Sequence, residues 1–225
     1  MEDVKKEIQM SESFRVASLL AVCGGILDAY SYLCRGGVFA NAQTGNIVLV
    51  GMNAAHGNFR GALSAAIPVA AFMLGILITE SMRNKFKTED AQLLHWRHLM
   101  LTLEIGLLAL AAFIPIGKWN SAVNVIIAFV CAMQVQTFKK VRGHSYASTM
   151  CTGNLRRGTE ALCSYKRTGD KEARHRGLCT FGVILSFILG AVVGSLIASY
   201  FPKFTLIMAI AIYLIAFLVM TSRHK

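Results

Sequence analysis

Inside its long apolar runs the chain carries a few carboxylate and amide side chains. Asp28 lies near the end of the run that begins at Phe14, and Gln134 and Gln136 hold the matching place in the run that begins at Asn120. A carboxylate can bind a proton or a cation, whereas an amide both donates and accepts hydrogen bonds. These residue types favour binding of a proton, a cation or a small polar solute.

A tripeptide repeat follows the same two runs. Thr-Gly-Asn occurs at Thr44-Gly45-Asn46 and again at Thr152-Gly153-Asn154, 108 positions further on, and the same offset places Asp28 on Gln136. A repeat of this kind in a hydrophobic chain indicates two structurally related halves. We therefore expect the two tripeptides and the polar residues before them to form one central site. The residues predicted to bind a substrate or an ion are Asp28, Thr44, Gly45, Asn46, Gln134, Gln136, Thr152, Gly153 and Asn154.

Each acidic candidate has a functional and a structural interpretation. A charged carboxylate at the centre of a bilayer costs about 2.5–3.5 kcal/mol, so Asp28 should face a partner, water or an ion. It is either a coupling or coordinating group or a structural hydrogen-bond partner. Glu104 is either a second titrating group or a hydrogen-bonding residue near the inner interface. Glu80 and Asn124 lie close to span ends and receive no role.

Enzyme chemistry has little support in the sequence. No nucleophile–base pair, metal triad or phosphate loop is visible, and the six cysteines show no metal-ligand spacing, so we expect no catalytic residue, no metal and no cofactor.

The composition is typical of a multi-pass membrane protein. Of 225 residues 55% are hydrophobic, and the mean hydropathy is +0.52. The net charge of +11 does not indicate nucleic-acid binding, because the basic residues flank apolar segments. An all-α helix bundle with six spans is predicted. The expected spans are Phe14–Leu33, Gly61–Ser81, His98–Ile116, Asn120–Phe138, Gly177–Tyr200 and Phe204–Thr221.

Charge placement predicts the orientation of these spans. With a cytoplasmic N-terminus, 19 of the 23 Lys and Arg residues lie on the inner side, among them Lys5, Lys6, Lys87, Arg223 and Lys225. Both termini are therefore predicted to be cytoplasmic. The chain is treated as one membrane domain, 1–225, with a first repeat at 14–116 and a second at 120–221. Three spans per repeat make the second repeat inverted.

The segments that carry the tripeptides leave alternatives open. Arg35–Arg60 fits either a re-entrant helix that starts at Thr44-Gly45-Asn46, capped by Thr44 or Asn46, or a surface turn with an interfacial helix. Leu155–Leu162 fits an amphipathic helix near the inner headgroups. The basic residues Arg156, Arg157, Lys166 and Arg167 either attract anionic lipid or take part in gating or in binding an anionic substrate. Thr168–Arg176 is expected to be an insert in the inner loop.

The run from Gly25 to Tyr32, followed by Gly36–Asn46, resembles the YoaK family of bacterial membrane proteins. The similarity continues through Ala132-Met133-Gln134 and Thr149–Asn154. It implies a multi-pass protein of the bacterial plasma membrane and supplies no substrate or reaction. Where the family commonly has Gln-Asn-Ala, this chain reads Gln134-Val135-Gln136, so no role of that Asn is carried over.

Two functions remain in competition. The first is a secondary transporter or channel-like permease for a small solute, with Asp28 as the coupling group and the tripeptides as gates. The second is a non-transporting scaffold that binds anionic lipid or a partner protein. It would use the basic inner loop and a ridge of small residues, which are Ser186, Gly190, Gly194 and Ala198. Six spans in two halves also allow a homodimer.

Overall fold

The computed structural model describes residues 10–86 and 90–222, and the side chains of all of these except 90–95. Lys5, Lys6, Lys87, Arg223 and Lys225, which contribute to the charge count, lie outside the described residues. The described chain is almost entirely helical. Its helices are α1 (Phe14–Cys34), α2 (Gln43–Ala55), α3 (Phe59–Lys85), α4 (Asp90–Phe113), α5 (Asn120–Thr137), α6 (Cys151–Thr168), α7 (Lys171–Tyr200) and α8 (Pro202–Thr221).

Among the described residues, six helices are long and apolar enough to cross a membrane, namely α1, α3, α4, α5, α7 and α8. This confirms the predicted all-α bundle with six spans. Side chains at their starts stabilise three of them, because Ser13, Asn58 and Asp170 each accept a hydrogen bond from a first-turn N–H.

Several predicted boundaries differ from the structure, and two of the differences have identifiable reasons. The third span ends at Phe113 instead of Ile116, because Ile114 precedes Pro115 and a residue before proline avoids the helical conformation. The expected insert at Thr168–Arg176 is mostly helix, since Asp170 caps α7 and the helix begins at Lys171.

A short hairpin between α5 and α6 was not predicted. Strands β1 (Lys140–Val141) and β2 (His144–Ser145) pair antiparallel around Arg142 and Gly143. Both turn residues have positive φ, 48° and 80°, as a two-residue hairpin turn requires.

The spanning helices pack in two equivalent arrangements. Helix α1 packs against α7 and α8, and α5 packs in the same way against α3 and α4, while α4 and α8 contact each other. Glycine allows close approach in both arrangements. A Cβ on Gly190 of α7 would collide with the backbone carbonyl oxygen of Val22 in α1. A Cβ on Gly75 of α3 would lie 2.8 Å from the carbonyl oxygen of Phe129 in α5.

The ridge of small residues on α7 is therefore an internal surface. Gly190, Gly194 and Ala198 are buried, and a Cβ on Gly194 would lie 2.7 Å from the Cα of Ile26 in α1. The ridge is covered by α1, so it is not available to a partner protein.

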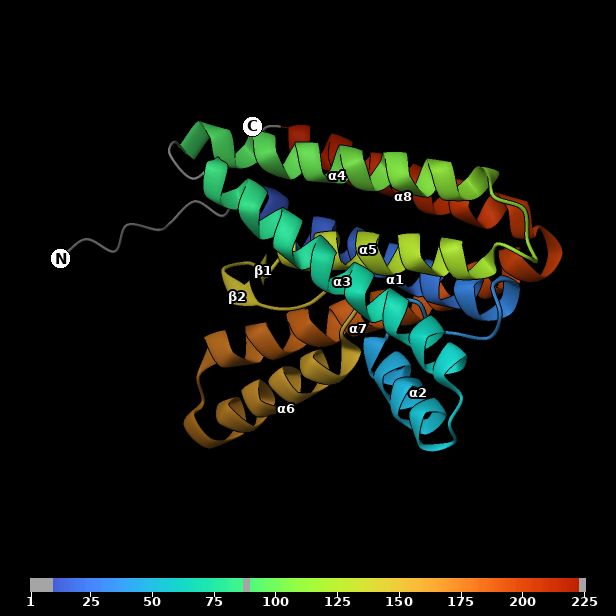
Figure 1. Cartoon of the computed structure of the whole chain (residues 1–225). Helices are drawn as coiled ribbons and strands as arrows, with labels where there is room; N and C mark the ends of the chain where they lie inside the picture. The colour runs from blue at the N-terminus through green and yellow to red at the C-terminus, as the bar shows by residue number, and fades with distance from the viewer. Residues whose placement is uncertain (1–9, 87–89, 223–225) are drawn as a thin grey trace.

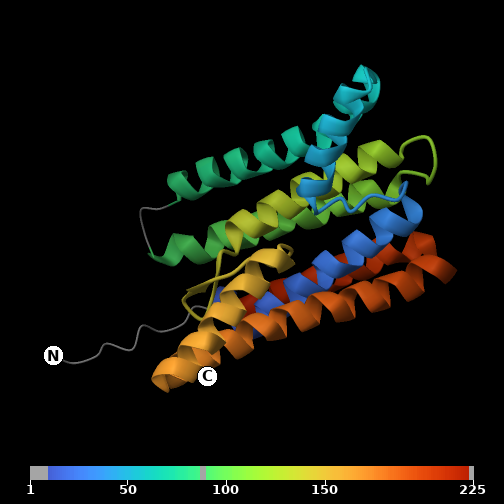
Figure 2. The same cartoon turned by 90° about the horizontal axis from the view of Figure 1, so that it is seen from below.

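The two shorter helices, α2 and α6, leave the bundle in different directions. In Figure 1 both begin near the middle of the bundle and diverge, α2 toward the end where α7 meets α8 and α6 toward the end that carries the hairpin. Figure 2 shows the same two starting points close together from below. Both helices have a Thr-Gly-Asn copy in their first turn.

Candidate functional site

Asp28 lies on α1 with 8% of its surface exposed. Its Oδ1 atom accepts a hydrogen bond of 3.0 Å from the backbone N–H of Asn41, two residues before α2. The Asn41 side chain donates to the carbonyl oxygen of Gly24, also at 3.0 Å. One residue therefore contacts two successive turns of α1.

The stretch that leads into α2 runs back along α1. The N–H of Ala40 donates to Ser31 Oγ at 3.1 Å, so Ala40 lies opposite Ser31 while Asn41 lies opposite Gly24 and Asp28. The chain leaves α1 at Cys34 and returns to the level of Gly24 before α2 begins. These bonds satisfy backbone groups that would otherwise be unpaired in a non-helical segment.

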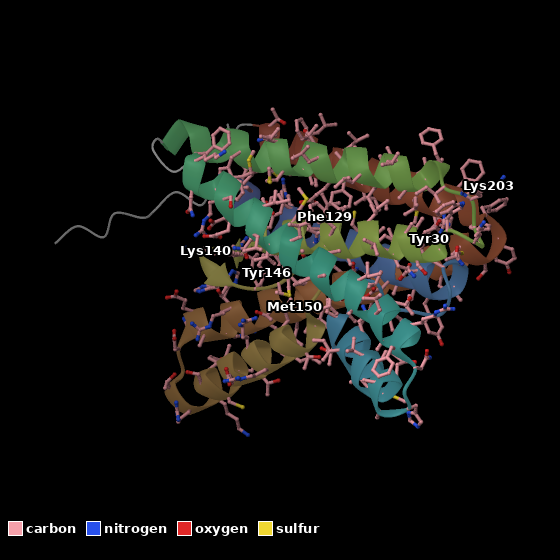
Figure 3. All side chains as sticks on the ribbon, in the orientation of Figure 1. Tyr30, Phe129, Lys140, Tyr146, Met150 and Lys203 are labelled. Atoms are coloured by element: carbon pink, nitrogen blue, oxygen red, sulfur yellow. The ribbon has the colours of Figure 1, made fainter. Side chains whose placement is uncertain are left out.

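The stretch that leads into α6 contacts the same turn of α1. A Cβ on Gly24 would lie 2.6 Å from the Thr149 methyl group, and Thr149 Oγ1 lies 3.2 Å from Cys131 Sγ in α5. In Figure 3 Met150 lies between Lys140 at one end of the bundle and Lys203 at the other. Residues before both short helices thus meet α1 at Gly24–Asp28.

The first residue of α6, Cys151, lies close enough to interact with Asp28. Burial raises the pKa of the Cys151 thiol, and the negative charge of Asp28 raises this pKa further. The starts of α2 and α6 therefore both lie near this carboxylate. Helix N-termini carry partial positive charge, so both helices favour an anion at this place.

The two tripeptides have different hydrogen bonds. The predicted caps are wrong, because the N-cap residues are Ala42 and Met150, and neither helix has a side-chain cap. Asn154 forms two hydrogen bonds with the backbone of Ala147, accepting at 3.1 Å and donating at 2.6 Å. Asn46 donates instead to Gln43 Oε1, within its own helix.

The remaining tripeptide residues are more accessible. Thr44, Gly45 and Thr152 are exposed and Gly153 is partly exposed, so only the two asparagines of the tripeptides are buried.

The structure separates the two candidate glutamines. Gln134 Nε2 donates to Leu20 O in α1 at 3.2 Å and to Ser148 Oγ, and its Oε1 accepts from the Tyr213 hydroxyl in α8. Gln134 therefore joins four parts of the chain. Gln136 donates to Glu80 of α3 and does not join Asp28.

Glu80 was assigned no role, yet it joins α3 to the end of α5. It accepts from Gln136, pairs with Arg83, and lies 3.5 Å from Lys139 Nζ. This cluster links the C-terminal ends of two spans.

Glu104 is enclosed in the bundle. It is 0% exposed, and within the described structure neither carboxylate oxygen has a hydrogen-bond partner. The predicted hydrogen bond near the inner interface is therefore not present. An ionised carboxylate without a partner is costly in such a place.

A cavity of about 240 Å³ lies between α2, α3 and α5, and no sequence pattern predicted it. Its polar wall residues are Asn46, Asn53, Ser64, Ser121 and Asn124. It lies at the N-terminal ends of α3 and α5, opposite the Glu80 cluster. These residues are far apart in the sequence, and only Asn46 belongs to a recognisable motif.

The comparisons with known proteins agree with this fold. The sequence pattern of a family described as "Protein of unknown function (DUF1275)" matches residues 16–219. The chain belongs to this family. It is 28% identical over 217 residues to the "UPF0700 transmembrane protein YoaK" of Bacillus subtilis (strain 168), covering 92% of this chain and 93% of that protein. No solved structure matches it. The resemblance found in the sequence is confirmed, and the chain is a multi-pass membrane protein of this family.

Proposed function

We propose that this chain is a secondary transporter or a channel-like permease for a small solute, with Asp28 as the coupling or coordinating group. The observation that carries the proposal is that the stretches before α2 and α6 both contact α1 at Gly24–Asp28, part-way along a spanning helix. Transporters bind solutes and coupling ions at broken or short helices near the middle of the membrane.

We also propose that the two halves are inverted repeats, 14–116 and 120–221, and that α2 and α6 are re-entrant elements that act as related gates. Three features support this. Both helices have Thr-Gly-Asn in their first turn, and they diverge toward opposite ends of the bundle. In addition, α1 of the first half packs on α7 and α8 of the second half, and α5 of the second half packs on α3 and α4 of the first half.

The two ends of α3 and α5 differ in a way that fits a site open to one side of the membrane at a time. A cavity separates their N-terminal ends, whereas Glu80 joins their C-terminal ends through Gln136 and Lys139. We propose that this cluster closes the inner side when the cavity is open.

The proposed orientation has both termini in the cytoplasm and the protein in the bacterial plasma membrane. Lys140 and Lys203 lie at opposite ends of the bundle, which offers a test. In intact cells, a membrane-impermeant thiol reagent should modify Lys203→Cys and not Lys140→Cys in a cysteine-free background. The reverse pattern would show the opposite orientation.

Flux measurements test the transport proposal. Proteoliposomes that contain the wild-type chain should take up a solute faster than empty liposomes, at a rate that depends on pH. We expect Asp28→Asn to abolish or change that pH dependence. Asn84→Leu, an exposed amide near the C-terminal end of α3, is the matched control. If Asp28→Asn leaves every measured flux and its pH dependence unchanged, the coupling role is wrong.

The scaffold alternative retains one of its two surfaces. The ridge on α7 is covered by α1, but the basic side chains of α6 are exposed; they are Arg156, Arg157, Lys166 and Arg167. We propose that they bind anionic lipid at the cytoplasmic face. Replacing all four by Gln should weaken retention of phosphatidylglycerol by the purified protein, and unchanged retention would contradict this role. A homodimer would have to use a surface other than the ridge.

A further inference from the structure

The cavity between α2, α3 and α5 has a polar wall without charge. Among the described residues, no Asp, Glu, Lys, Arg or His lines it. Its apolar lining includes Val38, Leu49, Ile67, Pro68 and Val125. A solute with a net charge would lose part of its hydration there without gaining a counter-charge. The wall therefore favours uncharged molecules.

Asn124 lines the cavity, but its amide oxygen is enclosed by the protein. The residue is 6% exposed, and its Nδ2 donates to the backbone oxygen of Arg35 at 2.9 Å. That bond fixes which end of the amide is the nitrogen. In the described structure Oδ1 has no hydrogen-bond partner and almost no accessible surface, so a solute in the cavity does not reach it.

The orientation of Asn46 follows from a chain of two amides. Gln43 Nε2 donates to the Ala40 oxygen at 2.8 Å, which leaves Gln43 Oε1 to accept from Asn46 Nδ2 at 2.9 Å. The remaining atom of the Asn46 amide, Oδ1, is again an acceptor. This amide oxygen, from α2, is thus available as an acceptor on the cavity wall.

Two hydroxyl groups also belong to the polar wall. Ser64 on α3 and Ser121 on α5 line the cavity, and a hydroxyl can either donate or accept. The volume of about 240 Å³ suits a small solute.

We propose that this cavity binds a small uncharged solute rich in hydrogen-bond donors, of the polyol or urea type, through Asn46 Oδ1 and the hydroxyl groups of Ser64 and Ser121. The assignment names the solute class of the transporter proposed above, and as a transport site it rests on that proposal. As a binding site it can be tested without any flux.

Saturation-transfer NMR on the full chain in lipid nanodiscs is the binding test. The neutral probes are glycerol, erythritol and urea, the charged probes of similar size are glycerate and choline, and empty nanodiscs give the background. We expect saturable binding of at least one neutral probe and none of the charged probes. Equal binding of charged probes, or no saturable binding of any neutral probe, would overturn the assignment.

Variants locate the binding. Asn46→Leu should weaken it about tenfold, because the amide acceptor on the wall is lost. Since this change also leaves Gln43 Oε1 without its donor, Ser64→Trp is a second variant. It fills the cavity from an exposed position on α3 and should abolish binding. Asn84→Leu, far from the cavity on the same helix, should bind as the wild type does. Unchanged binding by a folded Ser64→Trp variant, checked by size exclusion, would place the solute elsewhere.

Flux of the bound probe separates this assignment from the transport proposal. If Ser64→Trp abolishes binding but the wild type shows no flux, the site is supported and transport is contradicted. If the wild type shows flux of a neutral probe and Ser64→Trp leaves that flux unchanged, transport is supported and the site is overturned.

Discussion

Asp28 and Asn41 are joined by a hydrogen bond of 3.0 Å from the Asn41 backbone N–H to the Asp28 carboxylate. This bond holds the non-helical stretch before α2 against the middle of a spanning helix. A carboxylate that is costly to bury thereby satisfies a backbone donor that is also costly to leave unpaired.

The crossing of α1 and α7 should tolerate no added side-chain atom. A Cβ on Gly25 would collide with the Phe187 carbonyl oxygen and lie 2.6 Å from the Ala191 nitrogen. Overpacking of this kind typically costs ~1–3 kcal/mol, so Gly25→Ala should lower the Tm of the purified protein by several degrees. Gly106→Ala is the control, because nothing lies within 4 Å of its added Cβ. Equal Tm values for both variants would show that the close crossing is absent.

The two tripeptide asparagines should differ in their effect on stability. Asn154→Ala removes two hydrogen bonds to the backbone of Ala147 and leaves buried groups unpaired, a loss of ~2 kcal/mol or more. Asn46→Ala removes one bond to Gln43 in the same helix. Thermal unfolding should therefore show the larger loss for Asn154→Ala. A larger loss for Asn46→Ala would contradict the assigned partners.

Gln134 should couple energetically to Tyr213. The Tyr213 hydroxyl donates to Gln134 Oε1 across α5 and α8, and both side chains are buried. In a double-mutant cycle with Gln134→Leu and Tyr213→Phe, we expect a coupling energy of ~0.5–3 kcal/mol. Gln136→Leu with Tyr213→Phe serves as the control, because Gln136 contacts Glu80 instead. Strict additivity in the first cycle would contradict the bond.

Glu104 should accept an uncharged substitute. Its carboxylate oxygens have no partner among the described residues, so Gln, with nearly the same shape and no charge, should leave the Tm unchanged or raise it. Glu104→Lys, which forces a charge into the same enclosed place, should prevent folding or lower the Tm strongly. A marked loss of stability in Glu104→Gln would indicate that the carboxylate itself is needed.

Local signals predicted the spanning helices well. The length of the apolar run and the charges beside it placed the span at Asn120–Phe138, within one residue of α5. Such a prediction succeeds because insertion of a helix into lipid depends on the composition of that segment itself. The partners of the polar residues depend on contacts that no local pattern contains. Asn124, for example, is held by the Arg35 oxygen, 89 positions away.

The separation of Gln134 from Gln136 could have been predicted from local geometry. The two residues were expected to share a site. Each residue of a helix is rotated by roughly 100° from the one before, so side chains two residues apart lie on nearly opposite faces. Gln134 accordingly faces α1 and α8, whereas Gln136 faces α3. Helical geometry alone argues against grouping them.

The reactivity of Cys151 tests the central relationship most directly, because it requires no knowledge of the solute. In a variant whose other cysteines are replaced, a small thiol reagent should modify Cys151 slowly at pH 8 and faster as the pH rises, because burial and then Asp28 raise its pKa.

Asp28→Asn removes the negative charge and so lowers the pKa of Cys151. We therefore predict a severalfold faster reaction at the same pH. The control is a variant in which Cys163, an exposed residue further along α6, is the single cysteine. Its reaction rate should not change with Asp28→Asn. If Asp28→Asn leaves the reaction rate of Cys151 unchanged in a folded protein, the central claim that α6 begins beside Asp28 is contradicted.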